Sequence, residues 1–446
     1  MSEHVEEQLA PAPGPGGGGP PPGTSAEPSG DERRAALARL ALIVVAGLVA
    51  AVMTGVTKTV LIVVAIIVMI MLHELGHFLT AKWAGMKVTE YFLGFGPRLW
   101  SVRKGETEYG VKAIPAGGYV KVVGMSNLEQ VDPAEEPRTY RQQPFWRRLS
   151  VAVAGSVVHF VLAFVLLYAL YTVTGVFDYD RPRLEVGSIS RLESGPSPAQ
   201  RAGFRVGDRI VAVDGQPLRS WDEVPPYIRT RPGQAITFEV EREGRRLELR
   251  ATPVDLSTVA VEGEGPRRPV SEPTGFVGIG PAFAVEKAGP GEALGKAAAG
   301  LGRASVETVK ALGTIFSAEG ASSYGRQLLG RAPDRSTPEE PRFLSPVGFV
   351  RVASQAADTG WREVLVLLLS INVFVGIFNM IPLLPLDGGH VAIAVYERLR
   401  SRKGRRYHAD VAKALPIYYA MFMLIVFLGL SSLYLDIVQP IANPFP

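Results

Sequence analysis

The sequence predicts a polytopic α-helical membrane protein with a β-rich region at the membrane face and a second β-rich domain outside the membrane. Two observations lead to this fold class. Hydrophobic residues make up 47% of the 446 residues, a high share for a soluble protein of this length. Long apolar stretches alternate with loops rich in Lys and Arg, which is the pattern of membrane spans and cytoplasmic loops.

Net charge and cysteine content limit the classes of function. The formal net charge is only +4 and the basic residues cluster beside apolar stretches, so we expect no nucleic-acid partner. The chain has no cysteine, which excludes disulfides, thiol nucleophiles and thiolate metal sites. Any metal site must therefore use His, Asp or Glu.

Residues 1–37 are predicted to be a disordered cytoplasmic tail. A Pro- and Gly-rich run extends to Gly23, and this composition buries too little apolar area to offset the chain entropy. The tail is not a signal peptide, because the first apolar segment begins near Leu40 and no small-residue cleavage site follows it.

Five apolar stretches are long enough to cross a hydrocarbon layer about 30 Å thick. They are 38–55, 59–80, 149–176, 362–382 and 414–438. The first two form one almost continuous run, which we divide between Thr54 and Thr59; one long tilted helix or an interfacial first segment is the alternative. The prediction is about four core spans plus one extra N-terminal span.

Basic clusters predict the side of the membrane on which each loop lies. Residues 82–148 and 398–413 hold two such clusters, and loops rich in Lys and Arg stay cytoplasmic. Arg33, Arg34 and Arg39, at and before the start of the first span, put the N-terminus on the same side. With five spans, the region 178–360 and the C-terminus then lie outside the cytoplasm.

The β-rich region at the membrane face is predicted over residues 88–125, where apolar and polar residues alternate. Turn residues occur at 94–97, 104–105 and 116–118. We therefore expect a small sheet with turns at these three positions.

A compact extracytoplasmic β-rich domain is predicted at 184–253. Its two clearest strands, 209–213 and 235–241, precede Asp-Gly and Glu-Gly turns. An amphipathic helix over 291–317 and a flexible Gly-, Ser- and Pro-rich loop over 318–342 are expected to follow.

The strongest chemical motif is His73-Glu74-Leu75-Gly76-His77, at the end of an apolar span. On a helix, positions i and i+4 share one face, so both imidazoles can reach one zinc ion. Glu74 then lies beside the open coordination position. Ionisable residues are costly within a membrane, which favours a functional role over a helix end whose polar residues merely reach water.

A catalytic zinc ion needs a third protein ligand if one position is to stay open for water. Asp387 follows an apolar span, precedes a glycine pair, and by the predicted topology lies on the same side as His77. An ordinary Asp-Gly turn is the alternative for this residue, and His390 is the next candidate ligand.

Further motifs follow in a fixed order along the chain. They are Gly94-Phe95-Gly96-Pro97, Gly117-Gly118-Tyr119, the span 149–165, Ala202-Gly203-Phe204-Arg205-Val206-Gly207-Asp208, and Asn379-x-x-Pro382 leading to Leu386-Asp387-Gly388. Together with the first motif they resemble the site-2 protease family of intramembrane zinc metalloproteases, in its bacterial branch with a single PDZ domain, the regulators of sigma-factor signalling. The resemblance covers about residues 59–440.

The resemblance implies a zinc endopeptidase with a Zn²⁺ cofactor, the ligands His73, His77 and Asp387, and Glu74 as general base. The candidate substrate-binding residues are Asn379, Pro382, Gly388 and His159. His159 stands where relatives often carry Asn, and it is either a hydrogen-bond donor beside the ligands, a substrate contact or a packing residue.

The resemblance also implies the domain organisation, the partners and the location. The expected segments are a catalytic membrane domain in two parts at 56–176 and 361–446, a PDZ-like domain at 184–253, and an extracytoplasmic linker at 254–360. The tail at 1–37 and the extra span at 38–55 lie outside the resemblance and are features of this chain. We expect a bacterial plasma-membrane protein whose substrates are single-span proteins such as anti-sigma factors.

In the expected reaction, Glu74 takes a proton from a zinc-activated water, which attacks a peptide of a locally unwound substrate helix. The sheet at 88–125 offers an edge to an extended substrate, and the PDZ-like domain screens or recruits substrates. A metal transporter should show repeated helical segments, and none is visible in the sequence. A catalytically dead scaffold would tolerate loss of Glu74 or Asp387, but both residues are present.

Overall fold

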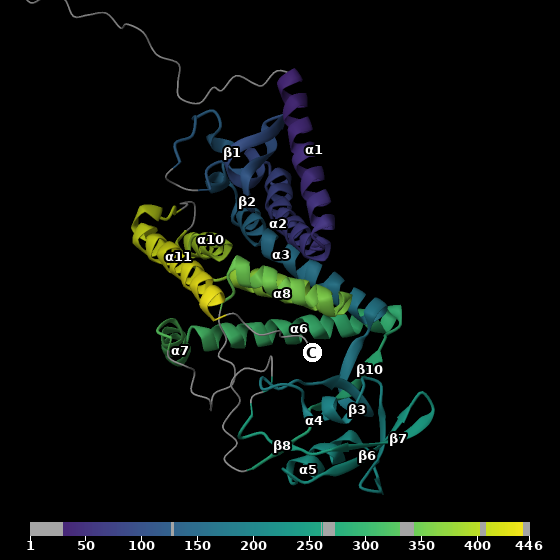
Figure 1. The fold of residues 1–446 in the computed structure, drawn as a ribbon. Coiled ribbons are helices and arrows are strands. Elements are labelled where there is room, and N and C mark those ends of the chain that lie inside the picture. Colours follow the sequence, from purple (N-terminus) through teal and green to yellow (C-terminus); the bar gives the residue numbers. More distant parts are fainter. Residues whose placement is uncertain are drawn as a thin grey trace, which may run out of the picture.

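The computed structural model describes residues 30–125, 129–259, 261, 273–330, 343–401 and 407–439. Long helices lie between a small sheet at one end of the molecule and a larger sheet at the other (Figure 1). Within the described residues, four helical segments are long and apolar enough to cross a membrane. They are Thr57–Trp83, Phe145–Thr174, Trp361–Phe378 and Ala412–Val438. The four predicted core spans are thus confirmed as long apolar helices.

The N-terminal apolar run is divided into two helices, α1 (Gly30–Met53) and α2 (Thr57–Trp83), as predicted. The break lies at Gly55, whose φ of 75° ends the first helix. The predicted tail lies outside the described residues up to residue 29, and its last part, from Gly30 on, is helical instead. The apolar part of α1, Leu37–Met53, is shorter than the other four spans. The extra crossing therefore stays a prediction.

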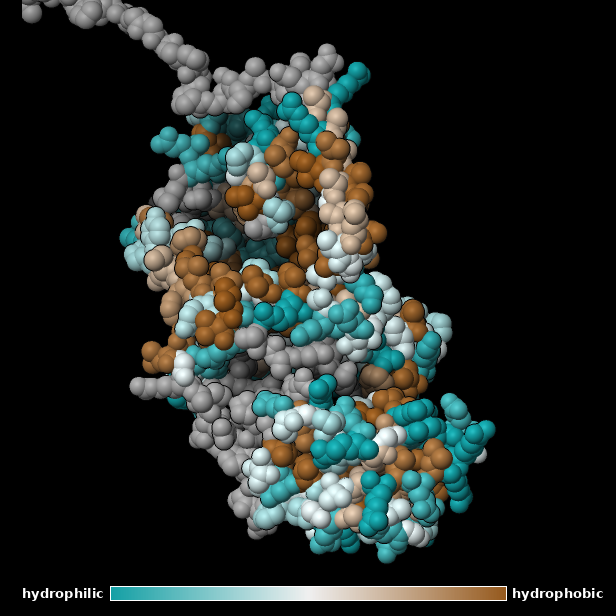
Figure 2. Space-filling model, viewed as in Figure 1, coloured by the Kyte–Doolittle hydropathy of each residue, from teal (hydrophilic) through white to brown (hydrophobic). Residues whose placement is uncertain are grey.

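Exposed apolar side chains mark the surfaces that would meet lipid. Figure 2 shows hydrophobic residues gathered along α1 and along α11 (Leu415–Val438). On α1, Leu42 and Val52 are 69% and 66% exposed, and on α11 Leu430 is 65% exposed. Such surfaces are unfavourable in water and favourable in a bilayer.

The predicted sheet over 88–125 is confirmed as one antiparallel hairpin of β1 (Val88–Lys104) and β2 (Thr107–Val122). The chain reverses at residue 105, as expected. Both strands run continuously through 94–97 and 116–118, but the hairpin folds back on itself there, as expected: residues 90–93 pair with 118–121 and also with 108–111. Glycines with positive φ at these positions permit the shifts of register and the change of direction of both strands.

Helix α3 (Phe145–Ala169), extended by the π-helical turn η3 (Leu170–Thr174), is the centre of the helical bundle. It contacts α2, α6 (Pro290–Ile315) and α9 (Trp361–Phe378). Small side chains line its buried face, among them Ala152, Gly155 and Ser156. Small residues let membrane helices approach closely, since packing and not water exclusion joins them. The predicted helix at 291–317 is confirmed by α6.

The span predicted over 362–382 ends earlier, at Phe378. Prolines follow at 382 and 385, and proline cannot continue a helix because it lacks an N–H and clashes with the preceding turn. Residues 379–386 therefore form turns, and a new helix, α10 (Asp387–Arg400), begins directly at Asp387.

Part of the loop expected at 318–342 is helical, so that expectation is wrong for α7 (Ala318–Leu328). Ser317 caps this helix, its Oγ accepting a hydrogen bond from the amide of Gly320 at 3.0 Å. Residues 331–342 lie outside the described residues. The chain continues in α8 (Pro346–Thr359), which packs against α2, α9 and α11.

The strands predicted at 184–253 are present in a sheet of six strands in the order β10-β3-β4-β6-β7, with β5 paired to β4. The sheet extends beyond the predicted bounds, because β3 begins at Val176 and β10 lies at Ile279–Glu286. The strands are β3 (Val176–Ile189), β4 (Arg209–Val213), β5 (Gln216–Pro217), β6 (Ile236–Arg242), β7 (Arg245–Ala251) and β10 (Ile279–Glu286). Two short helices, α4 (Pro198–Ala202) and α5 (Val224–Arg229), and the short pair β8 (Val254–Asp255) and β9 (Gly275–Phe276) complete it. The predicted turns after β4 and β6 are confirmed by positive φ at Asp214 and Glu243.

Candidate metal centre

Helix α2 presents the two motif histidines on one buried face. His73 and His77 lie one turn apart, and their Nε2 atoms are 3.3 Å from each other. Both side chains are buried. Two imidazole nitrogens this close, in a site with little water, suit joint binding of a cation.

The orientation of His77 is fixed by a main-chain contact. Its Nδ1 lies 2.7 Å from the carbonyl oxygen of Val151 on α3, so Nδ1–H donates to that oxygen. The proton on Nδ1 leaves the Nε2 lone pair free. In metal-binding histidines, a hydrogen bond of this kind from the other ring nitrogen fixes the orientation of the ring.

The third member of the cluster comes from the start of α10. Asp387 Oδ2 lies 3.4 Å from His73 Nε2 and 3.2 Å from His77 Nε2. Two glycines make this approach possible, because a Cβ on Gly388 would lie 2.3 Å from the carbonyl oxygen of Ile381, and one on Gly389 would meet the backbone of the same turn. The helix can start here only with glycine at these positions.

The three atoms form a nearly equilateral triangle with edges of 3.3, 3.4 and 3.2 Å. A tetrahedral zinc ion with ligand bonds of 2.0–2.1 Å separates its ligand atoms by about 3.3–3.4 Å. The donor set therefore fits zinc in both size and chemistry. Within the described part of the chain, these residues are the group of three that could hold a metal ion.

His390, the alternative third ligand, does not join this triangle. Its ring packs edge-on against the ring of Tyr140, with 6.3 Å between the centroids. Burial lowers the pKa of His390 to about 4, so the side chain is neutral. Its surroundings are those of a packing residue.

Glu74 lies on the same helix, half-buried, against the β hairpin. The backbone of Val120 in β2 contacts its carboxylate. The neighbouring Gly118 permits this approach, because a Cβ there would lie 2.9 Å from Met71 Sδ and 3.3 Å from Glu74 Cγ. Tyr91 of β1 adds a hydrogen bond from its hydroxyl to the carbonyl oxygen of Met71, at 2.7 Å. The hairpin thus fixes the position of Glu74.

Gly155 is a site residue that the sequence interpretation missed. A Cβ on Gly155 would lie 2.3 Å from His73 Cε1 and 2.5 Å from His77 Nε2. On α2, which packs against α3 here, a Cβ on Gly76 would lie 2.9 Å from the carbonyl oxygen of Ala154. The run of small residues in α3 was the available signal, but it does not identify which residue faces the histidines.

His159 contacts the cluster without joining it. Its ring centroid lies 4.9 Å from that of His73, and its Nδ1 lies 2.9 Å from Oδ1 of Asn372 in α9. Asn372 Nδ2 donates to the carbonyl oxygen of Leu368, so its Oδ1 is the acceptor for His159. His159 is therefore a hydrogen-bonded, buried link between α3, α9 and the ring of His73.

The remaining predicted site residues lie on the turn between α9 and α10. The amide of Gly388 donates to the carbonyl oxygen of Asn379 at 2.7 Å, which closes this turn. Asn379 is half-buried and Pro382 is exposed, whereas Gly388 is buried. Asn379 and Pro382 are therefore accessible to a second molecule. Gly388 is buried, and its amide closes the turn.

The chain is similar to known zinc metalloproteases. Residues 60–427 match the family model "Peptidase family M50". Zinc metalloprotease Rip1 of Mycobacterium tuberculosis is 36% identical over 413 residues, which cover 87% of this chain and 99% of the relative. Rip1 of Mycolicibacterium smegmatis is 32% identical, over 86% of this chain and 98% of the relative. A putative zinc metalloprotease of Rhizobium meliloti is 30% identical, over 75% and 85%.

The family match spans most of the chain, and it includes both halves of the cluster, the motif on α2 and Asp387 on α10. Four long apolar helices agree with a multi-pass membrane protein. The chain therefore belongs to peptidase family M50, as an intramembrane zinc metalloprotease that uses Zn²⁺ and acts on membrane-protein substrates.

Proposed function

We propose that this protein cleaves single-span membrane proteins such as anti-sigma factors, with His73, His77 and Asp387 as zinc ligands and Glu74 as general base. One observation carries the assignment of the ligands. The three donor atoms form a triangle whose edges, 3.2–3.4 Å, match the ligand spacing of a tetrahedral zinc site.

Glu74 performs the proton transfers in this proposal. When bound, zinc supplies a Lewis acid that acidifies the attacking water and polarises the scissile carbonyl. Glu74 accepts the proton of the water and returns it to the leaving amine. Its contacts with Val120 and Gly118 support this role, because a base must be held within hydrogen-bonding reach of the atom it serves.

A substrate helix must unwind before cleavage, since its carbonyls are hydrogen-bonded within the helix. The hairpin of β1 and β2 has outer edges on which an unwound segment can add as a strand. Asn379, Pro382, Gly388 and His159 are the proposed substrate-binding residues. The accessibility of Asn379 and Pro382, beside the start of α10, supports this role for these two most directly.

The proposed topology has the N-terminus and the β1–β2 hairpin in the cytoplasm of a bacterium, with α1 as an extra span of the plasma membrane. The segment 184–253 is then an extracytoplasmic PDZ-like domain, followed by a linker at 254–360. The parts 56–176 and 361–446 together form the catalytic membrane domain. The opposite ends occupied by the hairpin and the larger sheet support this division (Figure 1).

The PDZ-like domain is proposed to select substrates and not to act in the chemistry. It lies at the far end of the molecule from the hairpin that holds Glu74. A protease with this arrangement cuts substrates whose outer portion has already been shortened, which is regulated intramembrane proteolysis.

The substrate proposal is tested with purified full-length protein and a panel of single-span anti-sigma factors, with and without a zinc chelator. We expect at least one member of the panel to be cut within its span, and cleavage to stop with chelator and return with zinc. Cleavage of soluble unfolded proteins at the same rate would contradict a membrane substrate.

The topology is tested with single introduced cysteines, because the chain has none of its own. A cysteine at Ser220 should react with an impermeant reagent in intact cells, and one at Lys104 only after lysis. The reverse pattern would overturn the proposed orientation.

A further inference from the structure

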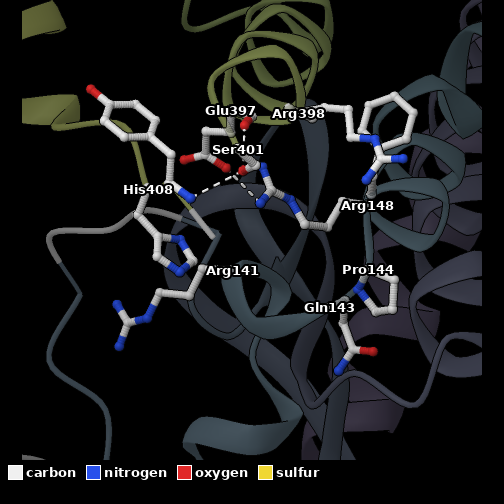
Figure 3. A pocket seen from close by; sticks show the side chains of 11 residues that line it. Arg141, Gln143, Pro144, Arg148, Glu397, Arg398, Ser401 and His408 are labelled. Carbon is white, nitrogen blue, oxygen red and sulfur yellow. Dashed lines mark hydrogen bonds and ion pairs between the residues drawn. The ribbon is translucent and has the colours of Figure 1, made fainter. Parts of the chain in front are cut away.

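A pocket lies between the N-terminus of α3 and the C-terminal half of α10. Its volume is about 160 Å³. Arg141 and Gln143 line it from opposite sides, and Arg148 and Glu397 line it between them (Figure 3). None of these residues belongs to the metal centre.

Positive charge exceeds negative charge in this pocket. Arg141, Arg148 and Arg398 line it, and Glu136 balances the charge of Arg141, whose Nε donates to Glu136 Oε1 at 2.7 Å. Arg148 Nη1 pairs with Glu397 Oε2 at 2.6 Å, which uses the only acidic group of the lining. Among the described residues, no acidic side chain pairs with the exposed Arg398. The pocket therefore retains positive charge that an anion would neutralise.

Within the described residues, the pocket also contains hydrogen-bond donors without partners, at the N-terminus of α3 and on Arg148. Helix α3 has no side-chain cap at its N-terminus, and the first turn of a helix carries free N–H groups and partial positive charge. Arg148, only 8% exposed, has an Nε–H without a hydrogen-bond partner. A buried donor of this kind is costly unless an acceptor is supplied. Both features favour an occupant that accepts hydrogen bonds and carries negative charge.

The position of the pocket suits the headgroup region of a bilayer. It opens beside the first turn of a membrane-spanning helix, where Trp146 is 73% exposed. Exposed tryptophan at the end of a span is typical of the membrane interface. Pro144 and Phe145 give the pocket an apolar wall next to its basic groups. This combination matches a molecule with a phosphate group and an adjoining apolar part.

We propose that this pocket binds a phosphate group, as carried by the headgroup of an anionic phospholipid. A soluble phosphate compound has the same recognition chemistry, and the experiment separates the two sources. Arg398 supplies the accessible charge, and Arg148 and the start of α3 supply buried donors. Because Glu397 and Asp387 lie on the same helix, an occupant here also steadies the helix that carries the third member of the metal cluster.

The test is native mass spectrometry of the full-length protein titrated separately with phosphatidylglycerol, phosphatidylcholine and inorganic phosphate. Arg398→Glu reverses the accessible charge of the pocket without disturbing a buried pair. Lys104→Glu is the matched control, since Lys104 is an exposed basic residue at the hairpin turn, outside the pocket. Metal content of each variant, measured in parallel, verifies that the fold is intact.

We expect the wild-type protein and the Lys104 variant to bind phosphatidylglycerol about tenfold more tightly than phosphatidylcholine, and Arg398→Glu to lose this preference. Binding of inorganic phosphate that depends on Arg398, without a preference between the lipids, would support the site with a soluble occupant. Equal binding by all three proteins, or no binding of either phosphatidylglycerol or phosphate to the wild type, would overturn the proposal.

Discussion

Gly155 of α3 packs directly against the imidazole of His73 on α2. A Cβ at position 155 would lie 2.3 Å from Cε1 of His73, closer than any unstrained contact. The same Cβ would lie 2.5 Å from Nε2 of His77, one of the proposed ligand atoms. The spacing of the metal cluster therefore depends on the absence of a side chain on a neighbouring helix.

Gly155→Ala should displace both histidines and lower the zinc affinity by roughly tenfold or more, because the methyl group overfills a packed site. Cleavage should fall with the metal content. Gly429→Ala in α11 is the matched control, since a Cβ there meets nothing within 4 Å. Full zinc content and activity in the Gly155 variant would show that α3 does not constrain the cluster.

Glu106 joins the hairpin turn to the end of α2. It pairs with Lys82 Nζ at 2.6 Å and with both terminal nitrogens of Arg138 at 2.8 and 2.9 Å. The hydrogen bonds from Arg138, followed by those from Lys82, lower the pKa of Glu106 from 4.5 to about 2. A lowered pKa in the folded state means that these interactions stabilise the fold above about pH 4.5 and are lost as the pH falls through about 2.

Glu106→Gln should therefore reduce stability by about 1 kcal/mol at pH 7, as a networked surface pair does. The difference from wild type should shrink below pH 4.5 and approach zero near pH 2. Thermal unfolding in detergent across this range measures it, with Glu307→Gln on α6, an exposed residue paired to Lys310, as the control. A difference that is independent of pH would contradict the ionic contribution.

Removing strands β4 to β9, and with them most of the larger sheet, should change substrate choice and leave the chemical step intact. Ile189 and Ile279 are paired across the antiparallel strands β3 and β10, so a two-residue Asn-Gly turn can join them and replace 190–278. This variant should cut a short model substrate at the wild-type rate. It should also accept substrates that still carry a folded outer domain, which we expect the full-length protein to exclude. Loss of cleavage of the short substrate in a folded, zinc-loaded variant would mean that the sheet takes part in catalysis.

Local periodicity and topology predicted most of the site. The interval from His73 to His77 fixes one helical face without any tertiary information. The distribution of basic residues predicted that Asp387 lies on the same side of the membrane as His77. The short distances from Asp387 Oδ2 to the Nε2 atoms of His73 and His77 agree with that prediction. The spans were predictable for a similar reason, because a bilayer requires a minimum apolar length.

The features that were missed depend on contacts between distant segments or on backbone detail. The exclusion of a side chain at Gly155 follows from how α3 crosses α2, which no local pattern encodes. The span was predicted to continue past Phe378 because the following residues are apolar. The helix ends at Phe378 because prolines follow it. The glycines at 94–97 were interpreted as a turn, which the structure confirms, but no local pattern shows that residues 90–93 then pair with 108–111 as well as with 118–121.

The central claim is that Glu74 transfers protons while Asp387 binds metal, and one paired measurement tests it directly. Zinc content and product formation are determined together for Glu74→Ala and Asp387→Ala in full-length protein. We expect Glu74→Ala to keep its zinc and lose cleavage, because a general base is not a ligand. Asp387→Ala should lose both, because two imidazoles leave the site incomplete. Retained turnover in the Glu74 variant, or unchanged zinc and activity in the Asp387 variant, would contradict the account.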